Sequence, residues 1–245
     1  MSAGLARPDG FVAEPVPPII GGSHDPLLEW AARQSGSGLA LLAEGSEAGL
    51  DRLERNEVAA AALHLHGQGD DDRANLEGVA GRAGLHDAVV IAFARREQGF
   101  VVAAGNPLGI GSMDDIARSH ARIGLRPKAA GAQMLLEAIV ARAGLPPERL
   151  HRAPGTYPTG PDLALAVRAR DIDCGIATRA VAAMQGLDFV PLVWERFDLA
   201  LRRRSYFEPP VQKLIAFMRN PAFAQRAEAL GGYNLAETGI VRLNR

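Results

Sequence analysis

Short apolar runs alternate along most of the chain with longer stretches in which apolar residues recur at helical spacing. Runs of roughly four to eight apolar residues are typical of buried strands, and a period of about 3.6 is typical of helices that cover a sheet. The pattern predicts strands at 18–21, 38–42, 58–65, 88–94, 100–103, 121–125, 174–177, 189–193 and 199–202. It predicts helices at 26–34, 47–55, 113–118, 131–143, 161–169, 179–185, 211–219 and 222–230. Because strands alternate with helices, we expect an α/β fold built from βαβ units, with mainly parallel sheets.

Several predicted boundaries carry residues that start or stop helices. Asp25 is a good N-cap, and Pro26 follows at the first helical position, where its missing N–H costs nothing. Gly144 follows the predicted helix 131–143 and suits a helix end. The acidic run 67–73 (GQGDDDR) is expected to be a solvated loop rather than a metal site.

The turn-forming segment 105–107 (GNP) separates a first set of predicted βαβ units from a second, so the chain is predicted to form two lobes. Residues 18–105 supply the first set of βαβ units and 106–189 the second, and the segment 190–245 is expected to rejoin the first lobe. Residues 1–17 are rich in Gly and Pro without periodicity, so they are expected to be a flexible leader. Two lobes predict a ligand cleft between them, since α/β sheets bind ligands beyond the carboxyl ends of their strands.

Composition narrows the classes of function. The 245 residues carry 27 Lys+Arg against 28 Asp+Glu, and a net charge of -1 argues against direct nucleic-acid binding, which needs many neutralised phosphates. The single cysteine, Cys174, excludes an intramolecular disulfide and a thiolate zinc cage, and it is expected to be a core thiol. No apolar run approaches the roughly 20 residues of a membrane span.

The sequence also lacks the familiar catalytic and targeting signatures. It contains no Gly-x-Ser-x-Gly elbow, no P-loop and no dinucleotide-binding fingerprint, so no catalytic residue and no cofactor are expected. Residues 1–11 lack the basic and apolar regions of a secretory signal. We therefore expect a cytoplasmic location, or a periplasmic one if the chain is a processed form.

The segment 20–26 (IGGSHDP) is a strand, a glycine turn and a helix start. Such a junction presents backbone N–H groups and the positive end of a helix dipole, which together bind anions. Ser23 and His24 would add side-chain donors, and Asp25 is assigned to capping or to a supporting contact. The alternative is a plain βα turn in which Ser23 and Asp25 only cap the helix.

A second strand-to-helix junction occurs at 124–133 (GLRPKAAGAQ). Here Arg126 and Lys128 supply positive charge, and the backbone around Ala130 and Gly131 is open to a ligand. Each charge-assisted hydrogen bond contributes about 1.5–3 kcal/mol, so three or four could support the roughly -8.2 kcal/mol of micromolar binding after ordering costs. A basic, solvated turn is the alternative.

Two histidines end the predicted strand 58–65 or follow it directly. His64 and His66 share a face because strand side chains alternate, and they are expected to donate to a ligand in the cleft. They could instead be structural, or ligate a metal together with His24, although a metal needs three or four converging ligands.

A loop ahead of the predicted helix 161–169 carries further hydroxyl groups. Thr156, Tyr157 and Thr159 lie in this loop. Thr156 and Tyr157 are assigned to the ligand site, although helix capping by Thr159 or Asp162 explains part of the pattern.

Several motifs together resemble a known family. They are 22–30 (GSHDPLLEW), 63–66 (LHLH), 94–102 (ARREQGFVV) and 105–107 (GNP). In them the chain resembles, over about residues 18–240, the periplasmic-binding-protein-like domains related to molybdate- and tungstate-type receptors. The resemblance implies a type II periplasmic-binding-protein-like fold, with two α/β lobes, a hinge and an interlobe cleft, and a ligand-sensing role without catalysis. Because such domains are often fused to helix-turn-helix regulators, it implies a DNA-binding domain outside this chain, or an ABC transporter, as the partner.

The second junction departs from this family. Receptors of this kind usually carry a Gly/Ser/Thr-rich turn there, whereas this chain has Arg126 and Lys128. Three hypotheses follow. The first is a non-enzymatic domain that closes around an oxyanion such as molybdate or tungstate, or around a small anionic metabolite. The second is an enzyme with His64 or His66 as base, and the third a metal-binding protein using His24, His64 and His66.

Overall fold

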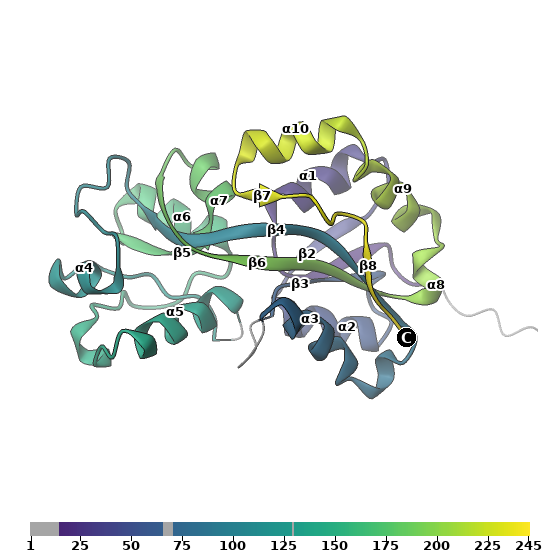
Figure 1. Cartoon of the computed structure of the whole chain (residues 1–245), viewed down its shortest axis with the longest axis horizontal. Coiled ribbons are helices and arrows are strands. Elements are labelled where there is room, and N and C mark those ends of the chain that lie inside the picture. The colour runs from purple at the N-terminus through teal and green to yellow at the C-terminus, as the bar shows by residue number, and fades with distance from the viewer. Residues whose placement is uncertain (1–14, 66–70, 129) are drawn as a thin grey trace, which may run out of the picture.

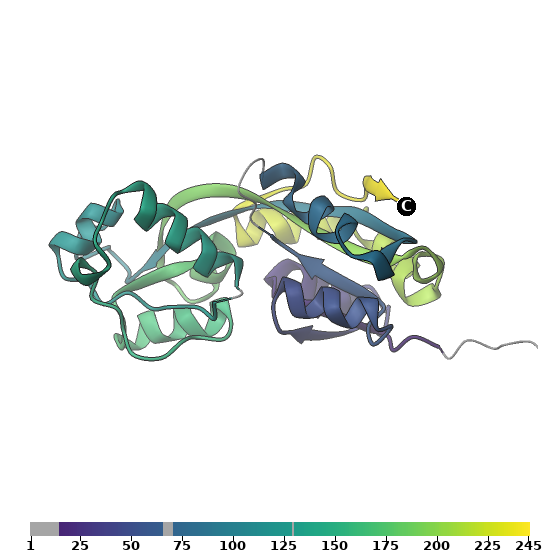
Figure 2. The same ribbon diagram turned by 90° about the horizontal axis from the view of Figure 1, so that it is seen from below.

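The computed structural model describes residues 15–65, 71–128 and 130–245 (Figure 1). It has two α/β lobes side by side, and two long strands run from one lobe into the other (Figures 1 and 2). These strands are β4 (Ala88–Val102) and β6 (Asp188–Arg202), which pair antiparallel along their whole length. They form the connection between the two lobes.

The first lobe is built on three short parallel strands in the order β2-β1-β3. They are β1 (Ile19–Gly22), β2 (Ala40–Ala43) and β3 (Ala60–Leu63). Helix α1 (Pro26–Gln34) follows β1 and helix α2 (Ser46–Glu54) follows β2. Because parallel strands run the same way, their carboxyl ends share one edge of the sheet.

The second lobe surrounds the far halves of β4 and β6. Its own strand is β5 (Cys174–Thr178), which pairs antiparallel with β4. The helices are α4 (Met113–Arg118), α5 (Gly131–Arg142), α6 (Gly160–Ala169) and α7 (Arg179–Met184). A short 3-10 turn at Pro147–Arg149 lies between α5 and α6.

The rest of the chain completes the first lobe. Helix α3 (Asp71–Ala80) and a 3-10 turn (Ala83–Leu85) precede β4. After β6 come α8 (Arg203–Tyr206), α9 (Pro209–Phe217), α10 (Pro221–Leu230), β7 (Tyr233–Asn234) and β8 (Val241–Asn244). Helices α9 and α10 pack on α1, and β7 and β8 pair with β4. None of the helices in the described ranges has both the length and the apolar composition that crossing a membrane requires.

The predicted elements are largely confirmed, but the two long strands were each predicted as two. The segments 88–94 and 100–103 are one strand, and so are 189–193 and 199–202. The pattern broke at 95–99 (RREQG) because polar side chains enter a buried network there instead of marking a loop. The expected mainly parallel sheet is also wrong, since β4 pairs antiparallel with both β5 and β6.

Three smaller expectations also changed. The run 67–73 was predicted to be a loop, but α3 already begins at Asp71, and residues 66–70 lie outside the described residues. The predicted strand 121–125 makes only isolated bridges at Ile123. Most of the predicted leader, residues 1–14, lies outside the described residues, and the lobe boundaries at 105 and 190 stay a proposal because β4 and β6 enter both lobes.

Two glycines hold α2 against β1 at the edge where the three strands end. A Cβ on Gly49 would lie 2.6 Å from Cα and 2.8 Å from N of Gly22. Gly22 itself has φ +109°, which a side chain disfavours. The two backbones therefore touch directly, and this contact places the first residue of α2, Ser46, beside the end of β1.

We predict that Gly49→Ala lowers the free energy of unfolding by about 1–3 kcal/mol, because the methyl group meets backbone that cannot yield. Helix propensity alone predicts a gain of about 1 kcal/mol. Gly78→Ala in α3 is a matched control, since the nearest atoms to its Cβ belong to the flexible side chains of Leu65 and Leu50 rather than to backbone. Urea unfolding of both variants measures the difference; equal stabilities would contradict the prediction.

Candidate functional site

A cavity of about 180 Å³ lies where the two lobes face each other. Its first-lobe wall consists of residues that follow the carboxyl ends of β1, β2 and β3, including Ser23, His24, Glu44, Gly45 and His64. This is the edge at which open α/β sheets bind ligands.

The second lobe and the connecting strand close the cavity from the other sides. Arg126, Ala130, Thr159 and Thr178 line it from the second lobe. Arg96 and Gln98 of β4 line it from the connection. The cavity is thus shared by both lobes, so a ligand in it would contact both.

Four helices begin at the cavity. Gly45, Ala130, Thr159 and Thr178 are the N-caps of α2, α5, α6 and α7, and all four line it. First-turn N–H groups have no partner inside a helix and carry the positive end of its dipole. Four such helix starts from two lobes favour an anionic occupant.

Hydroxyl groups join the ends of β1 and β3 to α2. The hydroxyl oxygens of Ser23 and Ser46 lie 2.8 Å apart, and Ser46 Oγ accepts the backbone N–H of His64 at 3.0 Å. The serine pair uses one hydroxyl proton for its own bond, which leaves the second proton for another acceptor. Because Ser23 lines the cavity, this relay can present a donor to a ligand.

His24 is held at the cavity rim by its own helix. Its Nε2 lies 3.1 Å from Oε2 of Glu29. Burial opposes ionisation of Glu29, but hydrogen bonds from His24 and Arg33 lower its pKa below the ordinary value. The ring of His24 is thus fixed in place by a carboxylate of the helix that follows it.

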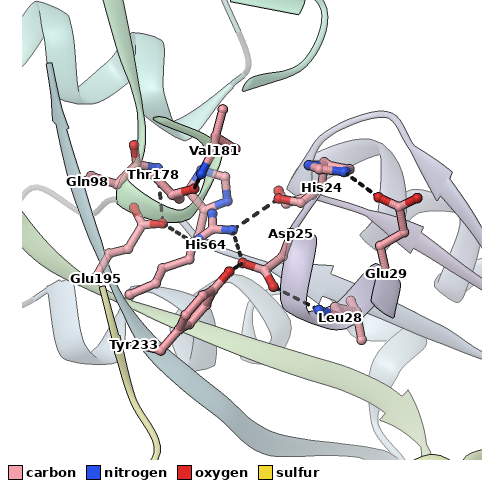
Figure 3. A network of polar contacts seen from close by, with 12 residues as sticks. His24, Asp25, Leu28, Glu29, His64, Gln98, Thr178, Val181, Glu195 and Tyr233 are labelled. Carbon is pink, nitrogen blue, oxygen red and sulfur yellow. Dashed lines mark hydrogen bonds and ion pairs between the residues drawn. The ribbon is translucent and has the colours of Figure 1, made fainter. Parts of the chain in front are cut away.

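A buried ionic network lies beneath the cavity (Figure 3). Arg96 is 2% exposed; its guanidinium donates to Glu195, to Asp25 at 3.1 Å and to the carbonyl of His24 at 3.1 Å. Burial alone would lower the pKa of Arg96, yet the carboxylates of Glu195 and Asp25 raise it. Arg96 therefore stays charged and stacks over the ring of Phe197, 4.1 Å from its centroid.

Asp25 links this network to the first turn of α1 and to Tyr233 of β7. One carboxylate oxygen accepts the N–H of Leu28, which confirms the predicted N-cap, and the other accepts the hydroxyl of Tyr233 at 2.9 Å. Burial raises the pKa of Tyr233 well above its ordinary value, and the Asp25 carboxylate adds to this, so the tyrosine remains a donor.

Arg126 supplies a cation to the cavity from the second lobe. Its guanidinium donates to the carbonyls of Tyr157 and Pro158 at 2.8 and 2.9 Å. Within the described ranges no carboxylate forms an ion pair with it. Burial lowers the pKa of Arg126 to about 10, which still leaves it positively charged at neutral pH.

The structure brings together most of the predicted ligand residues. Ser23, His24, His64, Arg126 and Ala130 line one cavity. Gly131 lies against His64 across the gap between the lobes, and a Cβ on it would stand 2.5 Å from the imidazole and 2.8 Å from the His64 carbonyl oxygen.

Three predicted residues are not at the cavity, and one is outside the described residues. Lys128 and Thr156 are exposed away from the wall. Tyr157 packs against the second-lobe core and contributes only its carbonyl to Arg126. His66 lies outside the described residues, so its role stays a prediction.

Sequence reasoning missed the polar residues of the connecting strand. Arg96 and Gln98 occupy alternate positions in a strand that is otherwise apolar, and both are 2% exposed. Their spacing by two was the available signal, because it places both side chains on one face. Among the described residues no group of three or more His, Cys, Asp or Glu is arranged to hold a metal ion.

The fold, the interlobe cavity and the sequence define a class of protein. Residues 27–219 match the family model of the PBP superfamily domain, and the chain belongs to this family. Its structure is a type II periplasmic-binding-protein fold, which confirms the resemblance and the predicted fold class.

Two curated relatives are uncharacterised proteins. YvgK of Bacillus subtilis is 27% identical over 148 residues, which are 60% of this chain and 47% of YvgK. A Clostridium pasteurianum protein encoded in the 5′ region of a 2Fe-2S ferredoxin gene is 34% identical over 58 residues, 24% of this chain and 51% of the relative. The chain spans about half the length of these relatives.

Solved structures share the fold at low identity. The tungstate ABC transporter structure from Geobacter sulfurreducens has a TM-score of 0.58 at 14% identity and covers 84% of this chain and 95% of that one. The sulfate-binding protein SubI of Mycobacterium tuberculosis has 0.59 at 16%, with 88% and 85% covered. PEB3 with bound L-phospholactate has 0.57 at 13%, with 88% and 98% covered. These similarities show the fold alone.

We predict that Gly131→Ala holds the lobes apart, because its methyl group would collide with the His64 backbone of the other lobe. The radius of gyration of the ligand-free protein, measured by small-angle X-ray scattering, should rise. Gly160→Ala is the matched control, since the nearest atoms to its Cβ belong to Val181, Ala177 and Arg126 of its own lobe, at 3.5–3.7 Å. An unchanged radius in Gly131→Ala would contradict the prediction.

Proposed function

We propose that the chain is a non-enzymatic solute-binding domain that closes its lobes around a small anion, either an oxyanion or a small anionic metabolite. The observation that carries this proposal is Arg126, a cation at the cavity without a carboxylate partner among the described residues. The starts of α2, α5 and α6 around it supply further positive potential.

The proposed ligand groups come from opposite lobes. Ser23, His24 and His64 belong to the first lobe, and Arg126 with the backbone around Ala130 and Gly131 belongs to the second. Since a ligand touches both sets only when the lobes approach, it would shift the population toward the closed form. A DNA-binding domain outside this chain, or an ABC transporter, could read that shift.

The arrangement supports binding better than catalysis. Cys174 is buried, and burial raises the pKa of its thiol to about 12, which suppresses the thiolate that a nucleophile requires. The carboxylates around the cavity accept hydrogen bonds from arginines: Glu44 from Arg52, and Glu195 from Arg96. They are therefore suited to holding the site's shape rather than to exchanging protons with a substrate.

We predict that Arg126→Met weakens anion binding by about ten- to a hundredfold, the equivalent of one charge-assisted hydrogen bond. Isothermal titration calorimetry with molybdate, tungstate, sulfate, hydrogen phosphate and small carboxylates would measure it. Lys128→Met is the matched control, because it removes a neighbouring positive charge that lies off the cavity wall. The proposal would be contradicted if the wild-type protein bound none of these anions, or if both variants lost anion affinity equally.

A further inference from the structure

Gln98 places a buried acceptor beside the cavity, whose other polar features are mostly donors. It lies on β4, lines the cavity and is 2% exposed. No donor among the described residues reaches its carboxamide oxygen, Oε1. Buried polar atoms are nearly always hydrogen-bonded in native proteins, so an atom of this kind at a ligand cavity needs an explanation.

The orientation of this carboxamide is fixed by its nitrogen. Nε2 of Gln98 donates to Oε1 of Glu195 at 3.1 Å, and the same oxygen accepts from Arg96. Rotating the amide by half a turn would place the Gln98 oxygen against this carboxylate oxygen, which is repulsive. Figure 3 shows the Gln98 nitrogen turned toward Glu195, with Thr178 beside the carboxamide.

A ligand made only of acceptors does not satisfy this cavity. Arg126, the serine pair Ser23 and Ser46, and the helix starts all donate. A fully deprotonated tetrahedral oxyanion matches those donors but leaves Oε1 of Gln98 unpaired. An anion that also carries an O–H or N–H group can accept hydrogen bonds from the donors and donate one to Oε1 of Gln98.

Building on the proposed function, we infer that the ligand is a small anion bearing a hydrogen-bond donor, and that Gln98 selects it by accepting that hydrogen. A protonated oxyanion and a hydroxy- or amino-carboxylate share this chemistry. The cavity, at about 180 Å³, has room on the scale of about six water molecules, which admits either.

Two pairs of probes, each matched in size and charge, test the inference by calorimetry on the whole chain. One is hydrogen phosphate against sulfate, at a pH where phosphate is the singly protonated dianion, and the other is lactate against 2-methylpropionate, in which a methyl group replaces the hydroxyl. In at least one pair, the donor-bearing member should bind about tenfold more tightly or better, since a site built to pair with a hydroxyl rejects the analogue that lacks it.

Gln98→Met removes the acceptor at similar volume and should bring the ratio within each pair close to one. Gln185→Met is the matched control. It makes the same replacement at a glutamine that does not line the cavity, so it should preserve the ratio within each pair. The comparison within the wild-type protein needs no variant, so it tests whether the ligand must carry a donor even if Gln98→Met folds poorly.

The outcomes separate this inference from the proposed function. Equal binding within both pairs, or a ratio that survives Gln98→Met, overturns the role of Gln98 while Arg126-dependent binding still supports an anion site. Tight, Arg126-dependent binding of tungstate or molybdate with silence of both donor-bearing probes also overturns it. If no anion binds, both the role of Gln98 and the proposed anion-binding function are overturned.

Discussion

The structure depends on keeping the guanidinium of Arg96 buried and charged. Removing a guanidinium from water is costly unless its hydrogen bonds are satisfied, and here Glu195, Asp25 and the carbonyl of His24 satisfy them together. These partners come from β6 and from the start of α1, while Tyr233 near the end of the chain bonds to Asp25. One buried charge therefore fixes the edge of the first lobe relative to the connecting strands, and the cavity is built on that edge.

Arg126, the cavity cation of the second lobe, lacks the carboxylate hydrogen-bond partners that Arg96 has among the described residues. Arg126 donates only to carbonyls among the described residues, and the charge of Asp162 favours its positive charge without forming an ion pair there. An anion would balance it and at the same time contact the first lobe. The same interaction can thus supply both affinity and the free-energy difference between open and closed forms, because only differential contacts shift a conformational equilibrium. The contact between Gly131 and His64 sets how close the lobes can come.

The sequence predicted the fold class, most elements and five of the cavity residues, because those depend on local signals. Asp25 before Pro26 caps α1 as its chemistry requires, and Ser23 lies at the cavity because a glycine turn ends β1. Arg96 and Gln98 were missed because their partners, Glu195 and Asp25, are distant in sequence, and the polar run looked like a break between strands. Lys128 was chosen for its charge, but its direction from the turn is set by tertiary packing.

The pairing of β3 with β6 has a consequence for how the molecule is assembled. Ala60 pairs with Leu201, so the sheet of the first lobe stays incomplete until the chain has traced the entire second lobe and come back. Contacts between such remote segments carry a large loop-closure entropy and slow folding. During synthesis the second lobe can become ordered before the first, although its sequence comes later. Until β6 is available, the β3 edge of the β1–β3 sheet stays unpaired.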